Sequence, residues 1–336
     1  MNSIMVQLRL SGAKRAAIIY NPIARGLARR KGSLHRITAL LSERGIQASL
    51  VATHGPGTAS EQVRREIDLG CHLVVAAGGD GTINEVANGM LHSGVPLAIL
   101  PGGTANVLAR EMQVPIHLER AAAQIPSLEP FRVAVGALRL RDSSPRCFLC
   151  MAGAGLDAEI VSRVDPALKI RTGKLAYYAG GLLQVFRPLR EFEVTVDGKP
   201  YLASFALLSR VRNYGGDLEI ARGASLLRDD FEVVLFRGTA SARYLSYFLG
   251  VALKRVHRMP GCTVLRAQSI VCEQAAGHAI FVQIDGELAG TLPMSVDILP
   301  DALTMLAPAS YLARERVFAG LAASERPSRL VPVAPE

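Results

Sequence analysis

The stretch Leu73-Val74-Val75-Ala76-Ala77-Gly78-Gly79-Asp80-Gly81-Thr82-Ile83-Asn84-Glu85-Val86-Ala87-Asn88-Gly89 decides the fold of this chain. It begins as an apolar, strand-like run, passes through three glycines and continues with helical spacing. This order is typical of a phosphate site, because glycine N–H groups can approach phosphate oxygens and the helix adds its positive N-terminal end. The alternative is a tight turn in which the aspartate only caps.

Asp80 stands among these glycines. An acidic side chain beside bound phosphates is unfavourable unless it serves Mg²⁺, directly or through water, so we predict Asp80 as the metal-side residue. Thr82 and Glu85 have the spacing of a capping box. We therefore predict that they cap the start of a helix near residues 83–90.

Two further loops repeat this logic. Pro101-Gly102-Gly103-Thr104-Ala105-Asn106 follows the predicted strand 97–100, and Asn21-Pro22-Ile23-Ala24-Arg25-Gly26 follows the predicted strand 16–20. Arg25 belongs to a basic cluster with residues 29–31. Loops at the carboxyl ends of neighbouring parallel strands face one crevice, so the three predict a nucleoside triphosphate pocket. The Gly-Lys-Ser/Thr pattern is absent from all of them, which excludes a P-loop NTPase.

The sequence around these loops divides into two halves. Up to about residue 126, short β-branched runs alternate with helical patterns, which predicts a buried parallel sheet covered by helices on both faces. Beyond residue 136, strand-like segments dominate, and Asp197-Gly198 separates two of them as in a hairpin, which predicts an antiparallel sheet or sandwich. Pro-rich residues 327–336 are expected to be loosely ordered.

Composition narrows the class of protein. The 336 residues are 49% hydrophobic with a mean hydropathy of +0.24, enough apolar material for a large core. The net charge of +9 suits an anionic partner. A secretion signal is not apparent, the longest apolar runs are too short to span a bilayer, and the five cysteines are an odd number. We therefore predict a cytoplasmic protein.

Three other patterns resemble functional motifs but also have a simple structural explanation. Gly153-Ala154-Gly155-Leu156-Asp157-Ala158 satisfies a weak dinucleotide fingerprint, but without a surrounding strand-helix-strand unit a glycine turn explains it better. Cys147 and Cys150 form a lone CxxC inside a strand-like segment, which argues against zinc. Asp285-Gly286-Glu287 follows a strand and on composition is an ordinary hairpin turn.

The combination of motifs changes the last interpretation. The loops at 78–82 through 88–89 and at 101–106, Asn213-Tyr214-Gly215-Gly216, and Asp285-Gly286-Glu287 occur in this order. Together they resemble the diacylglycerol kinase catalytic family, and more narrowly its soluble bacterial lipid kinases, over residues 15–308. Asp157 also matches a family pattern.

The resemblance implies an α/β N-terminal nucleotide-binding domain similar to those of NAD kinases and phosphofructokinases, followed by a C-terminal antiparallel β-sandwich domain. We expect an ATP-binding domain over 1–132, a lipid-substrate domain over 133–308, and a segment over 309–336 partly packed back on the first, with the active site between the domains. By position, Asp285 matches the family's general base and Glu287 the acid that supports it. The positions that match or flank the family's ATP contacts are Asn21, Arg25, Gly26, Thr53, Gly78, Gly79, Asp80, Gly81, Thr82, Asn84, Thr104 and Asn106.

Two departures from the family stand out. Ala24-Arg25 precedes Gly26 where the family has a small residue directly before the glycine, so the phosphate geometry of this loop is expected to differ. The family also binds a structural Mg²⁺ beside an acidic Asp-Gly turn, whereas here Arg228 occupies the place of the acid, followed by Asp229 and Asp230. Substitution by Asp229 or Asp230 with a register shift is the alternative, and we do not assign that metal site.

The expected function is an ATP- and Mg²⁺-dependent kinase of a lipid alcohol, in peripheral contact with the inner membrane surface. Basic and apolar residues over 171–190 and 243–258 suit docking on anionic lipid, although ordinary amphipathic core helices explain them equally well. Nucleic acid is not expected, because aromatic residues do not interleave with the basic ones. An NAD kinase-like enzyme and a catalytically weak lipid-binding regulatory protein remain alternatives, and the sequence leaves a homodimer open.

Overall fold

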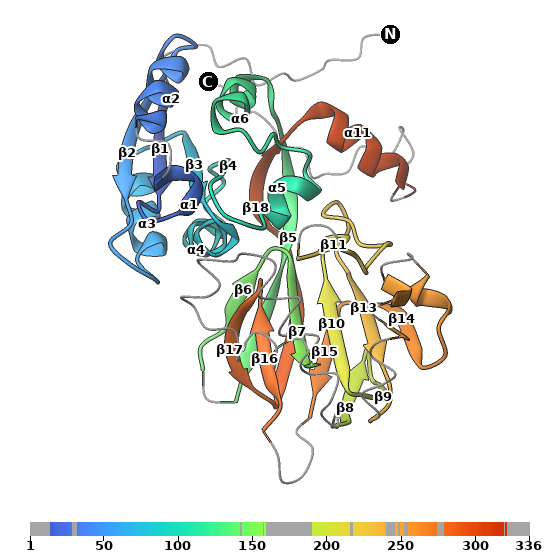
Figure 1. The fold of residues 1–336 in the computed structure, drawn as a ribbon. Coiled ribbons are helices and arrows are strands. Elements are labelled where there is room, and N and C mark those ends of the chain that lie inside the picture. The colour runs from blue at the N-terminus through green and yellow to red at the C-terminus, as the bar shows by residue number, and fades with distance from the viewer. Residues whose placement is uncertain are drawn as a thin grey trace. The chain divides into compact units, whose positions relative to one another are not determined.

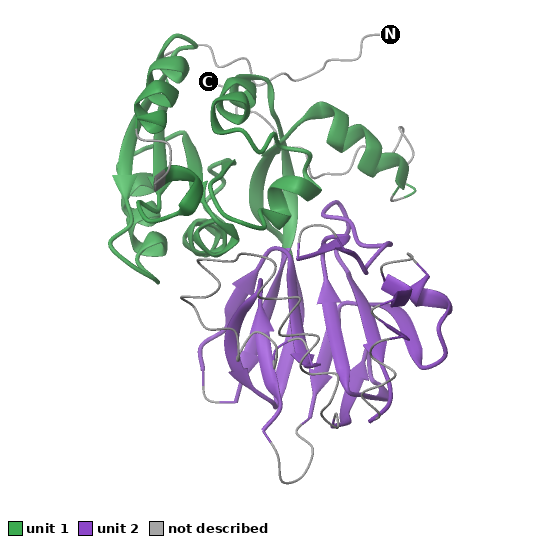
Figure 2. Cartoon of the chain, viewed as in Figure 1, with its two compact units in different colours: residues 1–134, 300–336 green, residues 135–299 purple. Residues whose placement is uncertain are grey.

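The computed structural model describes residues 14–28, 32–141, 143–156, 158, 190–215, 218–239, 246–247, 249–251, 255–273, 279–318 and 320. The chain divides into two units, one formed by residues 1–134 together with 300–336 and the other by residues 135–299 (Figure 2). We expected boundaries after residues 132 and 308, whereas the structure divides the chain after residues 134 and 299.

The first unit is built on four parallel strands in the order β2-β1-β3-β4 (Figure 1). All six residues of β3 are buried, which is why this strand is a continuous apolar run in the sequence. These strands are β1 (Lys14–Tyr20), β2 (Ile46–Ala52), β3 (Leu73–Gly78) and β4 (Leu97–Pro101). The helices described in this unit are α1 (Arg25–Ala28), α2 (Ser33–Ser42), α3 (Ala59–Asp68), α4 (Asp80–Met90), α5 (Val107–Glu111), α6 (Leu118–Gln124), the 3-10 helix η1 (Ile125–Ser127) and α11 (Ala309–Phe318).

Two long strands pass from one unit into the other. β5 (Glu129–Leu140) leaves the first unit, and β18 (Met294–Ala307) returns to it. The second half of β18 is parallel to β4, with Met305 opposite Leu97, and the first half is antiparallel to β15 (Ser269–Cys272). The first unit therefore needs residues from both ends of the chain.

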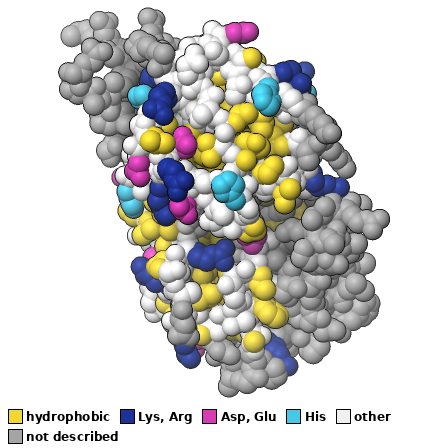
Figure 3. Space-filling model, turned by 90° about the vertical axis from the view of Figure 1, so that its left-hand side faces the viewer, with side chains coloured by type: hydrophobic (Ala, Val, Ile, Leu, Met, Phe, Trp, Pro, Cys, Tyr) yellow, Lys and Arg dark blue, Asp and Glu magenta, His cyan; other side chains and the backbone are white. Residues whose placement is uncertain are grey.

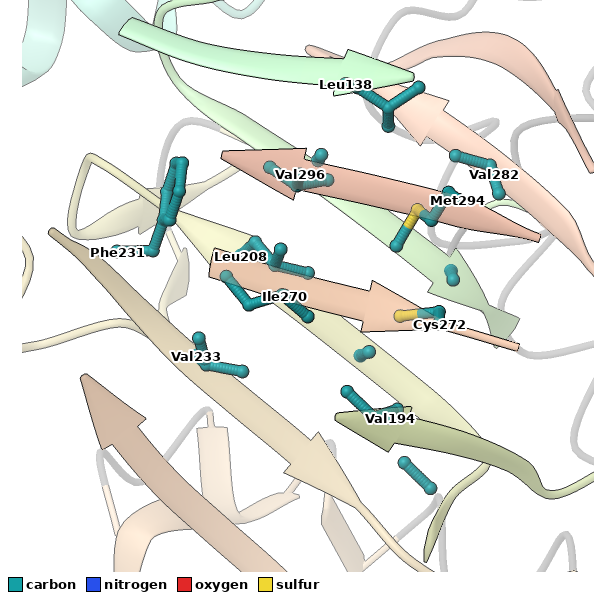
Figure 4. Close-up of a cluster of buried hydrophobic side chains, with 14 of the residues drawn as sticks. Leu138, Val194, Leu208, Phe231, Val233, Ile270, Cys272, Val282, Met294 and Val296 are labelled. Carbon is teal, nitrogen blue, oxygen red and sulfur yellow. The ribbon is translucent and has the colours of Figure 1, made fainter. Parts of the chain in front are cut away.

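The second unit is an antiparallel β-sandwich. One layer is the six-stranded sheet β14-β13-β10-β7-β16-β17, and the other includes β8, β9, β15 and the first half of β18. Apolar side chains from both layers point toward one another, as Leu208 and Phe231 from the first do toward Ile270 and Val296 from the second (Figure 4). Its remaining elements are β6 (Arg146–Phe148), β7 (Met151–Gly155), β8 (Phe192–Val196), β9 (Lys199–Ala203), β10 (Phe205–Ser209), β11 (Asn213–Tyr214), β12 (Leu218–Glu219), β13 (Phe231–Phe236), the 3-10 helix η2 (Val256–Arg258), β14 (Cys262–Ala267), β16 (Phe281–Ile284) and β17 (Glu287–Thr291).

This architecture confirms the predicted fold class, an α/β N-terminal domain followed by an antiparallel β-sandwich. The hairpin predicted at Asp197-Gly198 is also present, because Val196 pairs with Lys199 across a two-residue turn. Both turn residues have positive φ, 44° and 81°, as a two-residue hairpin turn requires. No helix formed by the described residues has both the length and the apolar character needed to cross a bilayer.

Candidate active site

Three glycine loops lie together in the first unit. They follow β1, β3 and β4, which are parallel neighbours, so their carboxyl ends share one edge of the sheet. The backbone joins them directly: Gly26 N donates to Gly102 O at 2.9 Å, and Gly102 N donates to Gly78 O at 2.7 Å. The residues predicted from three separate stretches of sequence are thus part of one backbone network.

Close approach explains why glycine occupies these positions. A Cβ atom at Gly103 would lie 2.5 Å from the Cα of Gly79, and one at Gly26 would lie 2.8 Å from Gly102 O. Both distances are shorter than real Cβ contacts, and the opposing atoms are backbone, which cannot move aside easily. The close approach of the loops therefore excludes a side chain at both positions.

Asn106 holds the second loop in shape. Its side-chain oxygen accepts a hydrogen bond from Gly103 N at 2.8 Å, and its amide nitrogen donates to Gly103 O at 3.0 Å. The residue is buried and has a φ of 49°, a left-handed conformation that asparagine tolerates better than most residues. The structure therefore gives Asn106 a role in bracing the loop, while its neighbour Thr104 is exposed.

Asp80 joins the start of α4 to the start of α5. It begins α4, and its Oδ1 accepts a hydrogen bond from Leu108 N, at the start of α5, at 3.3 Å. Burial raises the pKa of Asp80, and backbone hydrogen bonds from Val107 and Leu108 oppose that shift. A carboxylate placed here stabilises the N-terminal end of α5.

The capping box predicted at Thr82 and Glu85 is wrong. The helix begins three residues earlier than residue 83, at Asp80, and its N-cap residue Gly79 has no side chain to cap with. Thr82 Oγ1 instead accepts a hydrogen bond from Asn21 Nδ2 at 3.5 Å, and Glu85 Oε2 accepts one from Ala59 N at 3.4 Å. Both side chains therefore join α4 to neighbouring segments, which spacing alone does not reveal.

The remaining predicted nucleotide residues also lie in the first unit. Thr53 follows β2, and its N–H donates to Tyr20 O at 2.8 Å, at the same edge of the sheet as the glycine loops. Gly81 and Asn84 lie within α4, and Arg25 begins α1. Residues 29–31 of the basic cluster lie outside the described residues.

Asp285 occupies the turn between β16 and β17 in the second unit. Its φ is 48° and that of Gly286 is 83°, so Asp-Gly forms a two-residue hairpin turn. Its Oδ1 accepts hydrogen bonds from Met151 N at 2.7 Å and Cys150 N at 3.1 Å, and its Oδ2 accepts one from Leu149 N at 3.3 Å. Three N–H donors fix the position of the carboxylate.

These donors come from a segment more than 130 residues earlier in the chain. Sequence reasoning did not identify Leu149, Cys150 or Met151, because a backbone N–H group has no side-chain signature. The segment is itself held by Arg210, whose backbone N–H donates to Cys150 O at 2.8 Å. Glu287, the predicted supporting acid, begins β17 and is exposed.

The structure also shows where the patterns with a simple structural explanation lie. Gly153-Ala154-Gly155 lies in β7, between β10 and β16 in the middle of the antiparallel sheet, which is not the setting of a dinucleotide fingerprint. Asp157 lies outside the described residues, as does Gly216 of the Asn213 motif. Cys147 and Cys150 are buried free thiols, and burial raises the pKa of Cys147.

Comparisons with known proteins agree with this arrangement. Residues 15–138 match the family described as diacylglycerol kinase catalytic domain, and residues 150–307 match the YegS C-terminal NAD kinase beta sandwich-like domain. A diacylglycerol kinase of Bacillus subtilis (strain 168) is 30% identical over 297 residues, which cover 83% of this chain and 92% of that protein. One from Mycobacterium tuberculosis (strain ATCC 25618 / H37Rv) is 25% identical over 310 residues, covering 90% of this chain and 98% of that protein.

Solved structures show the same fold. The crystal structure of a diacylglycerol kinase from Bacillus anthracis str. Sterne has a TM-score of 0.69 and 23% identity, covering 88% of this chain and 98% of that one. The identity and coverage of the Bacillus subtilis relative, together with the two matched domains, confirm the resemblance that the motifs suggested. This chain belongs to the diacylglycerol kinase family.

Proposed function

We propose that this protein is an ATP- and Mg²⁺-dependent lipid kinase, which transfers the γ-phosphate of ATP to the primary hydroxyl of a lipid such as diacylglycerol. The observation that carries the proposal is the Asp285 carboxylate, held at a hairpin turn by three backbone N–H groups. Phosphoryl transfer needs a positioned carboxylate to accept the hydroxyl proton, and Asp285 has the chemistry for that role. The names of the curated relatives support diacylglycerol as the first acceptor to test.

In this proposal the first unit carries the nucleotide residues and the second carries the base. The glycine loops of the first unit bind the phosphates of ATP through backbone N–H groups and the start of α4. Mg²⁺, when bound, neutralises phosphate charge, and Asp80 is the residue we propose beside it. The oxygen of the lipid hydroxyl bonds to the γ-phosphorus while the bond from that phosphorus to ADP breaks. Asp285 takes the proton that the hydroxyl loses. Glu287 supports Asp285 in this proposal.

The test is transfer of labelled γ-phosphate from ATP to a panel of lipid alcohols in mixed micelles. We expect Asp285→Asn to lower turnover by at least roughly a hundredfold, the scale of a general base, while nucleotide binding measured by calorimetry stays unchanged. Near-wild-type turnover of this variant would remove Asp285 from the role of base.

Asp197 offers a matched control. It also precedes a glycine in a two-residue hairpin turn at positive φ, and its Oδ1 also accepts backbone N–H bonds, from Gln268 and Ser269. Asp197→Asn therefore reproduces the local structural change without touching the proposed base, and we expect it to retain turnover. If labelled NAD forms and no labelled lipid does, the protein is an NAD kinase-like enzyme; no transfer to any acceptor favours a regulatory lipid-binding protein.

We also propose that the protein contacts anionic membrane surfaces peripherally, since its lipid acceptor resides there. Among the residues behind this expectation, Arg190 and Arg255 are described and exposed, and most of the rest lie outside the described residues. On the face that Figure 3 shows, described Lys and Arg side chains are dispersed among acidic and apolar ones. Co-sedimentation with anionic vesicles should weaken when Arg187, Arg190, Lys254 and Arg255 are neutralised; unchanged binding would dismiss the proposal.

A further inference from the structure

The segment leading into β13 carries an arginine-carboxylate pair where the family resemblance implies a structural Mg²⁺. Arg228 Nε lies 3.0 Å from Asp230 Oδ1 and 3.1 Å from Oδ2, and Arg228 Nη2 lies 2.6 Å from the same Oδ2. Two guanidinium nitrogens thus engage both carboxylate oxygens, the geometry in which arginine binds carboxylates most strongly. The Asp230 carboxylate accordingly raises the pKa of Arg228.

Two more arginines fix the same segment, Arg266 from β14 and Arg210 from the residue after β10. Arg266 of β14 places Nη1 3.5 Å from Asp230 Oδ2 and donates from Nη2 to Gly223 O at 3.1 Å. Arg210, which is fully buried, donates from Nη1 to Asp230 O at 2.7 Å and from Nη2 to Leu226 O at 3.3 Å. We call Arg210, Arg228, Arg266 and Asp230 the arginine clamp. It holds residues 223–230 at Gly223, Leu226 and Asp230.

A divalent cation does not fit this group of side chains. Residues 228–232 carry three carboxyl groups, Asp229, Asp230 and the buried Glu232, against the three guanidinium groups of the clamp, so these side chains have no excess negative charge to attract a divalent cation. Both oxygens of Asp230 are already bonded to Arg228, and burial raises the pKa of Glu232, which favours its neutral form. Among the described residues, moreover, no group of three or more His, Cys, Asp or Glu side chains is placed to hold a metal ion.

We propose that the arginine clamp takes the place of the structural divalent cation in this protein, so that residues 223–232 keep their fold without metal. The guanidinium of Arg228 supplies the positive charge, and Arg210 and Arg266 bind the carbonyl oxygens of the segment. The proposal concerns the folded state and does not depend on the proposed kinase reaction, in which Mg²⁺ accompanies ATP.

The clamp is also bonded to the segment that holds Asp285. The backbone N–H of Arg210 donates to Cys150 O, and Cys150 N donates to Asp285 Oδ1. Asp230 and Asp285 are therefore separated by two residues, Arg210 and Cys150, that hydrogen bond to one another. Arg228 thus holds Asp230, at one end of this row of hydrogen-bonded residues, without an exchangeable ion.

The experiment measures thermal unfolding without nucleotide, in EDTA and in millimolar Mg²⁺, for the wild type, Arg228→Asp and Arg222→Asp. Arg222 is the matched control, because it lies on the same segment but pairs at 3.9 Å with Glu219 rather than with Asp230. We expect the wild type and Arg222→Asp to melt at the same temperature in both solutions. We expect Arg228→Asp to melt at least about 5 °C lower in EDTA, because like charges then face each other, and to recover part of that loss in Mg²⁺.

Three results would overturn the proposal. The first is a wild-type melting temperature that rises with Mg²⁺, and the second is an Arg228→Asp protein as stable in EDTA as the wild type. The third is an Arg228→Asp protein whose lowered melting temperature ignores Mg²⁺. If this variant does not fold, the wild type decides the question: metal analysis after EDTA treatment should find no stoichiometric cation and an unchanged melting temperature, whereas a retained cation overturns the proposal. None of these readouts uses kinase activity, so failure of the clamp and failure of the proposed function are distinguishable.

Discussion

The glycine loops of the first unit and the Asp285 turn of the second build their sites in opposite ways. The loops pack backbone against backbone, and their defining side chains are missing ones: at Gly103 even a methyl group would meet the Cα of Gly79. The turn carries one half-buried carboxylate, which backbone N–H groups hold in place. Adding a side chain should damage the glycine loops, and removing the carboxylate charge should damage the Asp285 turn. Substitutions of these two kinds therefore distinguish the two regions.

The largest effect is expected at Gly103. Its Cβ would lie 2.5 Å from the Cα of Gly79, whereas a Cβ at Gly79 would lie 3.4 Å from the Cα of Gly103, an ordinary contact. Gly103→Ala should therefore cost about 1–3 kcal/mol of unfolding free energy and weaken ATP binding more than tenfold, while Gly79→Ala should stay close to wild type in stability. Urea unfolding and calorimetry measure both quantities. Equal effects of the two substitutions would contradict the view that the loops are set by this asymmetric approach.

Asp80 sharpens the comparison, because it is a charged side chain inside the backbone site. Asp80→Ala removes the acceptor for Leu108 N and should cost about 1 kcal/mol, the usual cost of a lost helix cap. Asp80→Asn keeps an oxygen for that bond, so its unfolding free energy should remain near wild type while turnover falls through loss of the charge beside Mg²⁺. A fully active Asp80→Asn would show that the residue acts only as a cap. Chemical unfolding and phosphate transfer are measured on the same preparations.

Glu232 gives the smallest effect and the one that depends on pH. Burial raises its pKa above the ordinary 4.5, so the folded state holds this proton to higher pH than the unfolded state does. The contribution of Glu232 to stability is therefore fully present below its unfolded pKa and is lost as pH rises through the folded one. The melting temperature of Glu232→Gln should fall less than that of the wild type between pH 4.5 and 7. Parallel pH profiles would show that this carboxyl does not titrate differently on folding.

The sequence predicted strands and helices where local patterns are strong. Periodicity located β3 and the hairpin at Asp197-Gly198 to within a residue or two, because burial imposes apolar runs and positive φ favours Asp-Gly. It did not predict that residues 300–307 return as a strand beside β4, since that pairing joins Met305 to Leu97 across about two hundred residues. Spacing at Thr82 and Glu85 suggested a local cap, yet both side chains bond to other segments.

In the candidate site, too, local residue types could be predicted and long-range pairing could not. The glycine loops carry a signal in their own residue types, and the structure joins the three loops by backbone bonds. Asp285 by its own composition is an ordinary hairpin residue, and only the resemblance to the family singled it out. The donors to Asp285 and the clamp around Asp230 carry no such signal, because they depend on backbone groups and on arginines from three different stretches. Tertiary pairing of this kind has no local pattern to read.

The return of β18 to the first unit has a consequence for biosynthesis. Residues 300–318 belong to the first unit, through β18 beside β4 and through α11, yet a ribosome makes them after the sandwich. The parallel sheet must wait, with the edge of β4 open, until the whole sandwich has been translated, although domains generally fold in the order of their synthesis. The sandwich, whose residues 135–299 are contiguous, is then the unit able to fold first on the emerging chain. A nascent chain stalled before residue 300 should accordingly contain a protease-resistant sandwich and a protease-sensitive N-terminal half.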